Sequence, residues 1–161
     1  MPRLFALDQN FPEPIIRALD TYITEAELVP LRQIDARLTA DIDDWEVILA
    51  LHHHERPWDG LVTTDEGMLS LPRELSVVRQ TNFTLVVAQD SGHDPIKATG
   101  LLLTHLPWIC RETSSAGGQV WRLVARNRPG MIRGTTSRRS PHISTGPQRT
   151  SGRREGSRMS S

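Results

Sequence analysis

The pattern that decides the fold first occurs in Arg3-Leu4-Phe5-Ala6-Leu7-Asp8-Gln9-Asn10-Phe11-Pro12. Residues 3–7 form a short apolar run, which is typical of a strand buried on both faces. Asp8 opens a polar turn signal. Pro12 and Pro14 suit the first turn of a helix, because a backbone N–H is not needed there. The stretch therefore predicts a buried strand that ends at Asp8 and leads into a helix.

The same alternation of strand and helix continues along most of the chain. Further apolar runs predict strands over residues 27–34, 60–64, 83–88 and 119–125. Helices are predicted over residues 43–54 and 68–75 and from residue 94 onward. This alternation predicts an α/β fold, a three-layer α/β/α arrangement with a mostly parallel central sheet. Ligands of such sheets bind outside the carboxyl ends of the strands.

Charge and composition divide the chain into two parts. The formal net charge is zero, but residues 1–125 carry ten Lys and Arg against eighteen Asp and Glu, whereas residues 126–161 carry nine Arg and one Glu. Residues 130–161 also lack Leu, Val, Phe, Trp and Tyr, so they cannot bury enough apolar surface to fold. We expect a domain over residues 1–128 and a disordered Arg/Ser/Gly-rich tail over residues 129–161. The tail is either a basic arm that attracts RNA or, as we favour, an extension without function.

Two further observations limit the class of protein. The single cysteine, Cys110, excludes an internal disulfide and a cysteine-based zinc site. No apolar run approaches the roughly 20 residues needed to span a bilayer, and the first apolar stretch is too short for a signal peptide. We therefore expect a cytoplasmic protein without a membrane partner.

Aspartates follow three of the predicted strands. Asp8, Asp65 and Asp90 stand where an apolar run ends. Because the carboxyl ends of parallel strands meet at one edge of a sheet, we expect these side chains to lie close together. Each of them also has a structural explanation as a turn residue, and this alternative is strongest for Asp90, which Ser91-Gly92 follows.

A fourth aspartate is predicted to point inward from a helix. Asp44 precedes Val47, Ile48 and Leu51 by three, four and seven residues, so it shares their apolar face. Asp43 lies on the outer side instead. The structural alternative for Asp44 is an acid at a helix start, where the helix dipole favours negative charge.

Clustered carboxylates imply a cation. They repel one another and raise each other's pKa, and a hard divalent cation with oxygen ligands removes that repulsion. Such a site can activate water and stabilise the leaving oxygen of a phosphodiester. The cation also inverts the local charge, which an acidic domain needs if it is to act on nucleic acid. We therefore expect Mg²⁺ or Mn²⁺ at this edge of the sheet.

Three motifs, taken in order, resemble those of PIN-like domains, which include the ribonucleases of toxin–antitoxin pairs. Residues 5–12 resemble the family's first strand, which ends in Asp and a polar pair before a helix. Residues 43–48, Asp-Asp-Trp-Glu-Val-Ile, resemble its acidic helix start. Residues 61–65, Leu-Val-Thr-Thr-Asp, resemble its strand that ends in Thr-Asp. The resemblance covers about residues 3–127 and leaves out the tail.

The resemblance implies a metal-dependent endoribonuclease that hydrolyses RNA phosphodiester bonds, in some members as the toxin of a toxin–antitoxin pair. Asp8, Asp44 and Asp65 take the metal-ligand positions, and Thr64 is expected to orient water or phosphate in catalysis. We choose Asp90 as the fourth metal ligand from strand geometry. The implied partner is RNA, and an antitoxin protein and a homodimer are further options that stay open.

Two alternatives stay open at this point. A PIN-like domain that lacks one ligand would be a catalytically inactive binding or regulatory module. A phosphotransfer enzyme could use Asp8 as its nucleophile, but the usual pattern has a second Asp two residues on, where this chain has Asn10.

Overall fold

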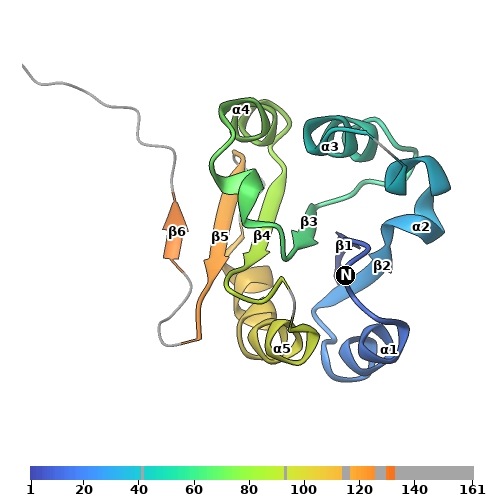
Figure 1. Ribbon diagram of the computed structural model, residues 1–161, viewed down its shortest axis with the longest axis vertical. Coiled ribbons are helices and arrows are strands. Elements are labelled where there is room, and N and C mark those ends of the chain that lie inside the picture. The colour runs from blue at the N-terminus through green and yellow to red at the C-terminus, as the bar shows by residue number, and fades with distance from the viewer. Residues whose placement is uncertain (41, 93, 114–116, 126–129, 133–161) are drawn as a thin grey trace, which may run out of the picture.

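A single six-stranded sheet organises the computed structural model, which describes residues 1–40, 42–92, 94–113, 117–125 and 130–132 (Figure 1). The strands lie in the order β2-β1-β3-β4-β5-β6. Strands β1 to β5 are parallel, and β6 is antiparallel to β5. Their bounds are β1 Arg3–Leu7, β2 Ala26–Pro30, β3 Gly60–Thr63, β4 Thr84–Ala88, β5 Gln119–Leu123 and β6 Gly130–Ile132.

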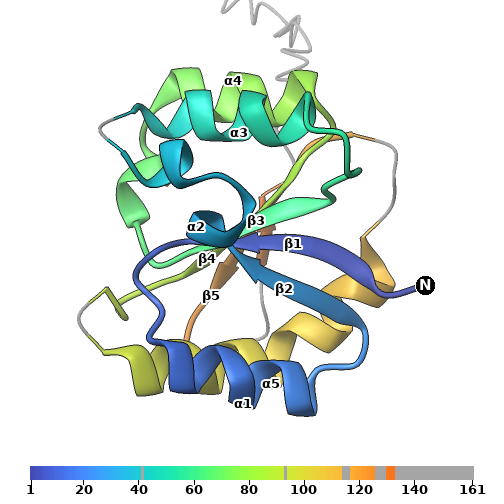
Figure 2. The ribbon, with the colours of Figure 1, turned by 90° about the vertical axis from the view of Figure 1, so that its right-hand side faces the viewer.

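Helices cover both faces of this sheet (Figure 2). Helices α1 (Glu13–Tyr22) and α5 (Pro95–Glu112) lie on one face, and α3 (Asp44–His52) and α4 (Pro72–Gln80) lie on the other. The short helices α2 (Leu31–Ile34), η1 (Ala36–Thr39) and η2 (Glu66–Leu69) connect these elements. The predicted α/β class and three-layer arrangement are confirmed. None of the described helices is long and apolar enough to cross a bilayer.

The pleat of the strands divides the core into two apolar clusters. Phe5 and Leu7 of β1 belong to the cluster under α1 and α5, whereas Leu4 and Ala6 belong to the cluster under α3 and α4. Strand β4 (Thr84–Ala88) is buried along its whole length, which explains why its sequence is a continuous apolar run and not an alternating one. Because both faces are packed, the register of the strands is fixed.

Strand register determines which residues meet at the carboxyl edge. Leu7 pairs with Val62, and Val62 pairs with Val86. The Asp8 backbone N–H then donates to the Val62 carbonyl at 2.9 Å. The residues that follow β1 and β3 are therefore neighbours, as the parallel sheet predicts. Helices α3 and α4 also begin at this edge (Figure 2).

Some element boundaries differ from the sequence prediction. The predicted strand over residues 27–34 stops at Pro30, and Leu31–Ile34 continues as the short helix α2. The single helix predicted over residues 68–75 is two elements, η2 and α4, because Pro72 takes the first position of a new helix. Gly130–Ile132 adds strand β6, which pairs antiparallel with β5 and was not predicted. Residues 129 and 133–161 of the predicted tail lie outside the described residues.

Candidate functional site

Asp8 and Asp65 are joined through the hydroxyl of Thr63. The Thr63 Oγ1 donates to Asp8 Oδ2 at 2.7 Å, and the backbone N–H of Asp65 donates to the same Oγ1 at 2.9 Å. Thr63 is the last residue of β3 and is fully buried. Sequence reasoning did not single out Thr63, because its role depends on the pairing of β1 with β3. Two of the predicted acids therefore lie together at the carboxyl edge.

Asp44 reaches the same edge from α3. It is the first residue of this helix, and Val47, Ile48 and Leu51 on its face are buried. Burial raises the pKa of Asp44, and the negative charges of the neighbouring acids raise it further, first Asp65, then Asp8, Glu74 and Asp43. A charge can act in this way only from nearby. The direction of this shift indicates that Asp44 lies near Asp65 and Asp8.

Asp43 lies on the other side of the helix start. It is exposed, and its Oδ2 accepts a hydrogen bond from the Trp45 indole at 3.0 Å. Its backbone N–H donates to Glu46 Oε2 at 3.0 Å. This is the contact of a capping box, in which an acid three residues after the N-cap binds the N-cap backbone N–H. Asp43 and Glu46 thus belong to the helix start, and Asp44 belongs to the site.

Glu74 is an acid of this region that sequence reasoning missed. It is the third residue of α4, and only 6% of its surface is exposed. Val77 and Val78 on the same helix face are buried. The rule that placed Asp44 inward applies here as well, because Glu74 stands three and four residues before them. The misplaced helix over residues 68–75 hid this signal.

Thr64 lies beside the acids with its hydroxyl unused. It is buried, and its Oγ1 has no hydrogen-bond partner among the described residues. An open pocket next to it is lined by Thr64, Asp65, Glu66, Gly67, Asp90, Gly92 and Asp94. A buried hydroxyl without a partner is costly unless something outside the chain binds it. Thr64 therefore lines the pocket beside Asp65, and its buried hydroxyl is the part of it that the described chain leaves unpaired.

Asp90 follows β4 in a tight turn. Its φ of 55° lies in the left-handed region, which Asp tolerates better than most residues. Its backbone N–H donates to Glu66 Oε1, and its carbonyl accepts from Lys97 Nζ at 2.8 Å. Asp90 lines the pocket beside Asp65, yet it is not among the charges that raise the Asp44 pKa. These contacts favour the turn explanation, and its role as a metal ligand stays a prediction.

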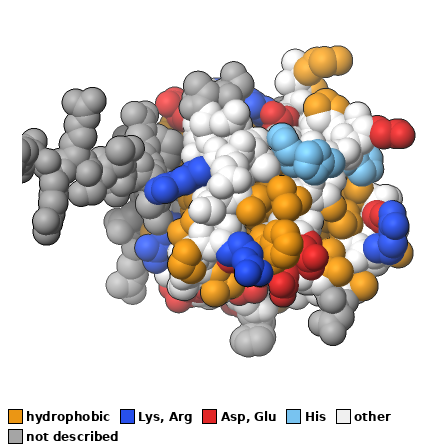
Figure 3. Space-filling view, turned by 90° about the horizontal axis from the view of Figure 1, so that it is seen from above, with side chains coloured by type: hydrophobic (Ala, Val, Ile, Leu, Met, Phe, Trp, Pro, Cys, Tyr) orange, Lys and Arg blue, Asp and Glu red, His pale blue; other side chains and the backbone are white. Residues whose placement is uncertain are grey.

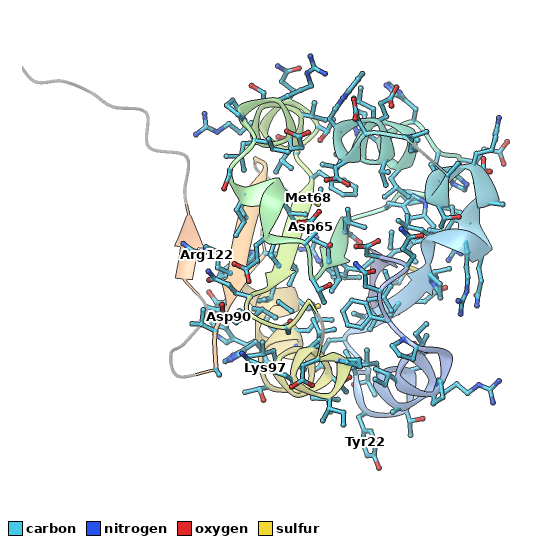
Figure 4. All side chains as sticks on the ribbon, viewed as in Figure 1. Tyr22, Asp65, Met68, Asp90, Lys97 and Arg122 are labelled. Carbon is cyan, nitrogen blue, oxygen red and sulfur yellow. The ribbon has the colours of Figure 1, made fainter. Side chains whose placement is uncertain are left out.

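A cationic side chain lines a neighbouring pocket. Arg122 of β5 donates from Nε and Nη2 to Gln89 Oε1 at 3.2 and 2.7 Å. A second pocket, lined by Glu66, Gly67, Leu69, Ser70, Gln89 and Arg122, shares Glu66 and Gly67 with the first. Figure 4 shows Asp65, Asp90 and Arg122 around the ends of β3, β4 and β5. The two pockets therefore place acids and a fixed guanidinium side by side.

The donor atoms at this edge fit a hard cation in kind. Asp8, Asp44, Asp65 and Glu74 offer carboxylate oxygens, the ligands that Mg²⁺ and Mn²⁺ prefer. Within the described ranges, however, no group of three or more His, Cys, Asp or Glu side chains is arranged to hold a metal ion. Asp65 Oδ1 instead accepts from the Gly67 N–H at 2.7 Å, and Asp8 Oδ1 accepts from the Gln9 N–H at 2.7 Å. Holding a cation would require these carboxylates to turn.

We expect Asp44→Asn to stabilise the protein at neutral pH. The pKa of the folded Asp44 lies above the ordinary value of 3.8, so its ionisation weakens the fold. This cost is absent below pH 3.8. It grows as the pH rises from 3.8 to the pKa of Asp44 in the folded protein, and it is constant at higher pH. The variant should gain up to about 1 kcal/mol at pH 7, the size usual for partly exposed charges, and the gain should vanish near pH 3.

Thermal unfolding of metal-free protein between pH 3 and 7 measures this gain. Asp94→Asn is the matched control, because Asp94 is exposed and caps α5 through the Lys97 N–H, a role that Asn fills equally well. Its melting temperature should follow the wild type at each pH. A destabilised Asp44→Asn at pH 7 would show that Asp44 is a structural residue of the helix start.

Comparison with family models, with curated proteins and with solved structures finds no match to this chain.

Proposed function

We propose that the chain is a PIN-like, metal-dependent endoribonuclease that hydrolyses RNA phosphodiester bonds at the carboxyl edge of its sheet. One observation carries this proposal. Asp8, Asp44 and Asp65 come from separate elements, yet Thr63 links Asp8 to Asp65, and the charges of both raise the pKa of Asp44. Negative charges near one another destabilise the fold, and binding of a cation would offset that cost.

The chain's own residues suit the roles that hydrolysis of a phosphodiester requires. Asp8, Asp44 and Asp65 would hold Mg²⁺ or Mn²⁺. When bound, the cation would activate water and stabilise the charge on the phosphate oxygens. Thr64, whose buried Oγ1 lacks a partner, would orient water or phosphate beside Asp65. Thr63 keeps Asp8 in place through its hydroxyl, and the other oxygen of that carboxylate, which accepts from the Gln9 N–H, would turn to the cation.

The cationic side of the edge supports RNA as the substrate. Figure 3 views the α3–α4 face and shows Lys and Arg side chains scattered among Asp and Glu, with a group of His side chains. That face therefore offers no continuous basic surface. Arg122, by contrast, lines a pocket that shares Glu66 and Gly67 with the pocket beside Asp65, and among the described residues it has no ion-pair partner. A guanidinium held in one orientation is well suited to bind phosphate.

The test is cleavage of labelled single-stranded RNA by the purified full chain. Cleavage should require Mn²⁺ or Mg²⁺ and should stop in EDTA. Mn²⁺ at about 100 times its dissociation constant should also stabilise the fold by roughly 2.7 kcal/mol. If RNA is not cut and Mn²⁺ leaves the melting temperature unchanged, the nuclease proposal is wrong.

A catalytically inactive PIN-like module is the second candidate. It is favoured by one observation, since carboxylate oxygens of Asp8 and Asp65 already accept hydrogen bonds from the chain. Such a module would bind RNA but would not cut it, whichever divalent metal ion is present. A toxin would instead arrest growth when expressed and be neutralised by an antitoxin protein. The antitoxin, the homodimer and the cytoplasmic location stay predictions.

We expect Arg122→Ala to weaken RNA binding without affecting the fold. Loss of one charge-assisted contact to phosphate should raise the dissociation constant by roughly tenfold and lower the salt slope by about 0.7. Binding is measured at several salt concentrations on an Asp65→Asn background, which prevents cleavage. Arg79→Ala is the control. Arg79 is exposed in the last turn of α4, at the end of this helix that lies away from the carboxyl edge of the sheet. Equal affinities of the two variants would exclude Arg122 from the RNA site.

A further inference from the structure

Glu74 is a buried carboxylic acid with an unused oxygen. The residue is 6% exposed, and its Oε2 has no hydrogen-bond partner among the described residues. Within the same ranges, no Lys, Arg or His forms an ion pair with it. A buried carboxylate costs free energy unless it is paired, protonated or bound to a cation. The chain alone therefore does not explain why an acid stands here.

The starts of α3 and α4 lie side by side and bring Glu74 to the acids. The Arg73 guanidinium lies over the Trp45 ring, with its carbon 5.2 Å from the ring centroid. Arg73 precedes Glu74, and Trp45 follows Asp44. This contact therefore joins the first turn of α4 to the first turn of α3. Figures 1 and 2 both show the two helices next to each other above the sheet.

Both acids point from these helix starts toward the sheet. Val77 and Val78 share the face of Glu74, and Val47 and Ile48 share the face of Asp44. All four apolar residues belong to one buried cluster between the helices and the sheet. The charge of Glu74 is also one of those that raise the pKa of Asp44, which agrees with this placement. Glu74 thus lies on the sheet-facing side of α4, near Asp44.

The other acids near this edge are less suited to complete the group. Glu66 Oε1 accepts a hydrogen bond from the backbone of Asp90. Asp94 accepts one from the Lys97 N–H at 2.9 Å and caps α5. Asp90 is exposed, and its charge is not among the main causes that raise the pKa of Asp44. Only Glu74 combines burial, an oxygen without a partner and a position beside Asp44.

We propose that Glu74, in place of Asp90, is the fourth acid that holds the divalent cation. This inference rests on the proposed function, because it concerns the cation that Asp8, Asp44 and Asp65 would hold. Glu74 reaches the site from α4, an element that contributes none of the other three acids. Its burial keeps water from competing for its oxygen, and the cation relieves the cost of the buried charge.

The experiment is calorimetric titration of the full chain with Mn²⁺, so that no RNA cleavage is involved. Wild type is compared with Glu74→Gln, which removes the charge at constant shape, and with Asp90→Asn. We expect Glu74→Gln to weaken Mn²⁺ binding at least tenfold and Asp90→Asn to change it less than twofold. Without metal, Glu74→Gln should melt at the wild-type temperature or above it, because an unpaired buried charge is gone.

Each other result overturns the inference in a recognisable way. Normal Mn²⁺ binding by Glu74→Gln would leave the nuclease proposal standing and remove Glu74 from the site. Failure of the wild type to bind Mn²⁺ would overturn both. Glu74→Leu, which fills the space with apolar atoms, serves if Glu74→Gln does not fold, and the same loss of Mn²⁺ affinity is expected. If neither variant folds, Glu74 is a structural residue.

Discussion

Asp65→Asn is expected to lower the rate of RNA cleavage by about 10³-fold or more while leaving the fold intact. The change removes one charged oxygen from the group that would hold the cation. A loss of about 4 kcal/mol of transition-state stabilisation, a usual contribution for metal-assisted hydrolysis, corresponds to this factor. The turn itself should survive, because an Asn oxygen can still accept the Gly67 N–H that Asp65 Oδ1 accepts at 2.7 Å.

Single-turnover cleavage in saturating Mn²⁺ measures this effect, with thermal unfolding as the check on folding. Asp94→Asn is the control, because Asp94 lines the same pocket but caps α5. Its rate should stay within about twofold of wild type, as expected for a residue that contributes little transition-state energy. If Asp65→Asn and Asp94→Asn cut RNA equally well, hydrolysis does not depend on the acids at this edge.

Asp8→Asn is a less clean test of the same idea. Asp8 accepts hydrogen bonds from the Thr63 hydroxyl and from the Gln9 N–H through its two oxygens. Asparagine offers only one accepting oxygen, so if that oxygen keeps the Gln9 N–H, the Thr63 hydroxyl can no longer donate to residue 8 and has to accept from its amide. A loss of activity could then come from a displaced Thr63 as well as from the missing charge. Asp65 avoids this ambiguity.

The sequence predicted those features of the site that depend on local pattern. Apolar runs ending in Asp placed Asp8 and Asp65 at the carboxyl ends of β1 and β3, and a parallel sheet then brought them to one edge. The spacing of Asp44 from Val47, Ile48 and Leu51 turned it inward. These inferences hold because buried strands and helix faces leave a period in the sequence that tertiary contacts do not change.

Features that depend on contacts between distant segments were not predictable in this way. The Thr63 hydroxyl links Asp8 to Asp65 only because β1 pairs with β3 in one register. Strand β6 forms through pairing with β5, although its three residues carry no alternating pattern. The position of Glu74 could have been predicted from its spacing, because it stands three and four residues before Val77 and Val78 on one helix face. It is missed because the sequence prediction runs one helix through Ser70-Leu71-Pro72, although Pro72 starts a new one.

Gly60→Ala, which adds one methyl group at the start of strand β3, is expected to cause a large loss of stability. A Cβ at this position would lie 2.1 Å from the Thr84 carbonyl oxygen and 2.6 Å from an edge carbon of the Phe5 ring. Both contacts are far too short. Strands β1 and β4 flank Gly60, which pairs with Phe5 and with Thr84, so neither neighbour can move without disturbing the sheet.

We expect this change to cost about 3 kcal/mol, the upper range for overpacking a core, and to lower the melting temperature by roughly 10 °C. Gly100→Ala is the matched control. Gly100 lies exposed in the middle of α5, and a methyl group added there would have no neighbour within 4 Å, so alanine should stabilise the helix by about 0.5–1 kcal/mol. Thermal unfolding without metal measures both variants.

The same variant connects the scaffold to the site. Strand β3 carries Thr63 at its end and Asp65 directly beyond it, and the position of Gly60 sets how closely β3 lies between β1 and β4. If Gly60→Ala folds at low temperature, the displaced strand should also separate Thr63 from Asp8 and weaken Mn²⁺ binding. A wild-type melting temperature would contradict the close packing of β1, β3 and β4. The register that brings Asp8 to Thr63 would then be wrong as well.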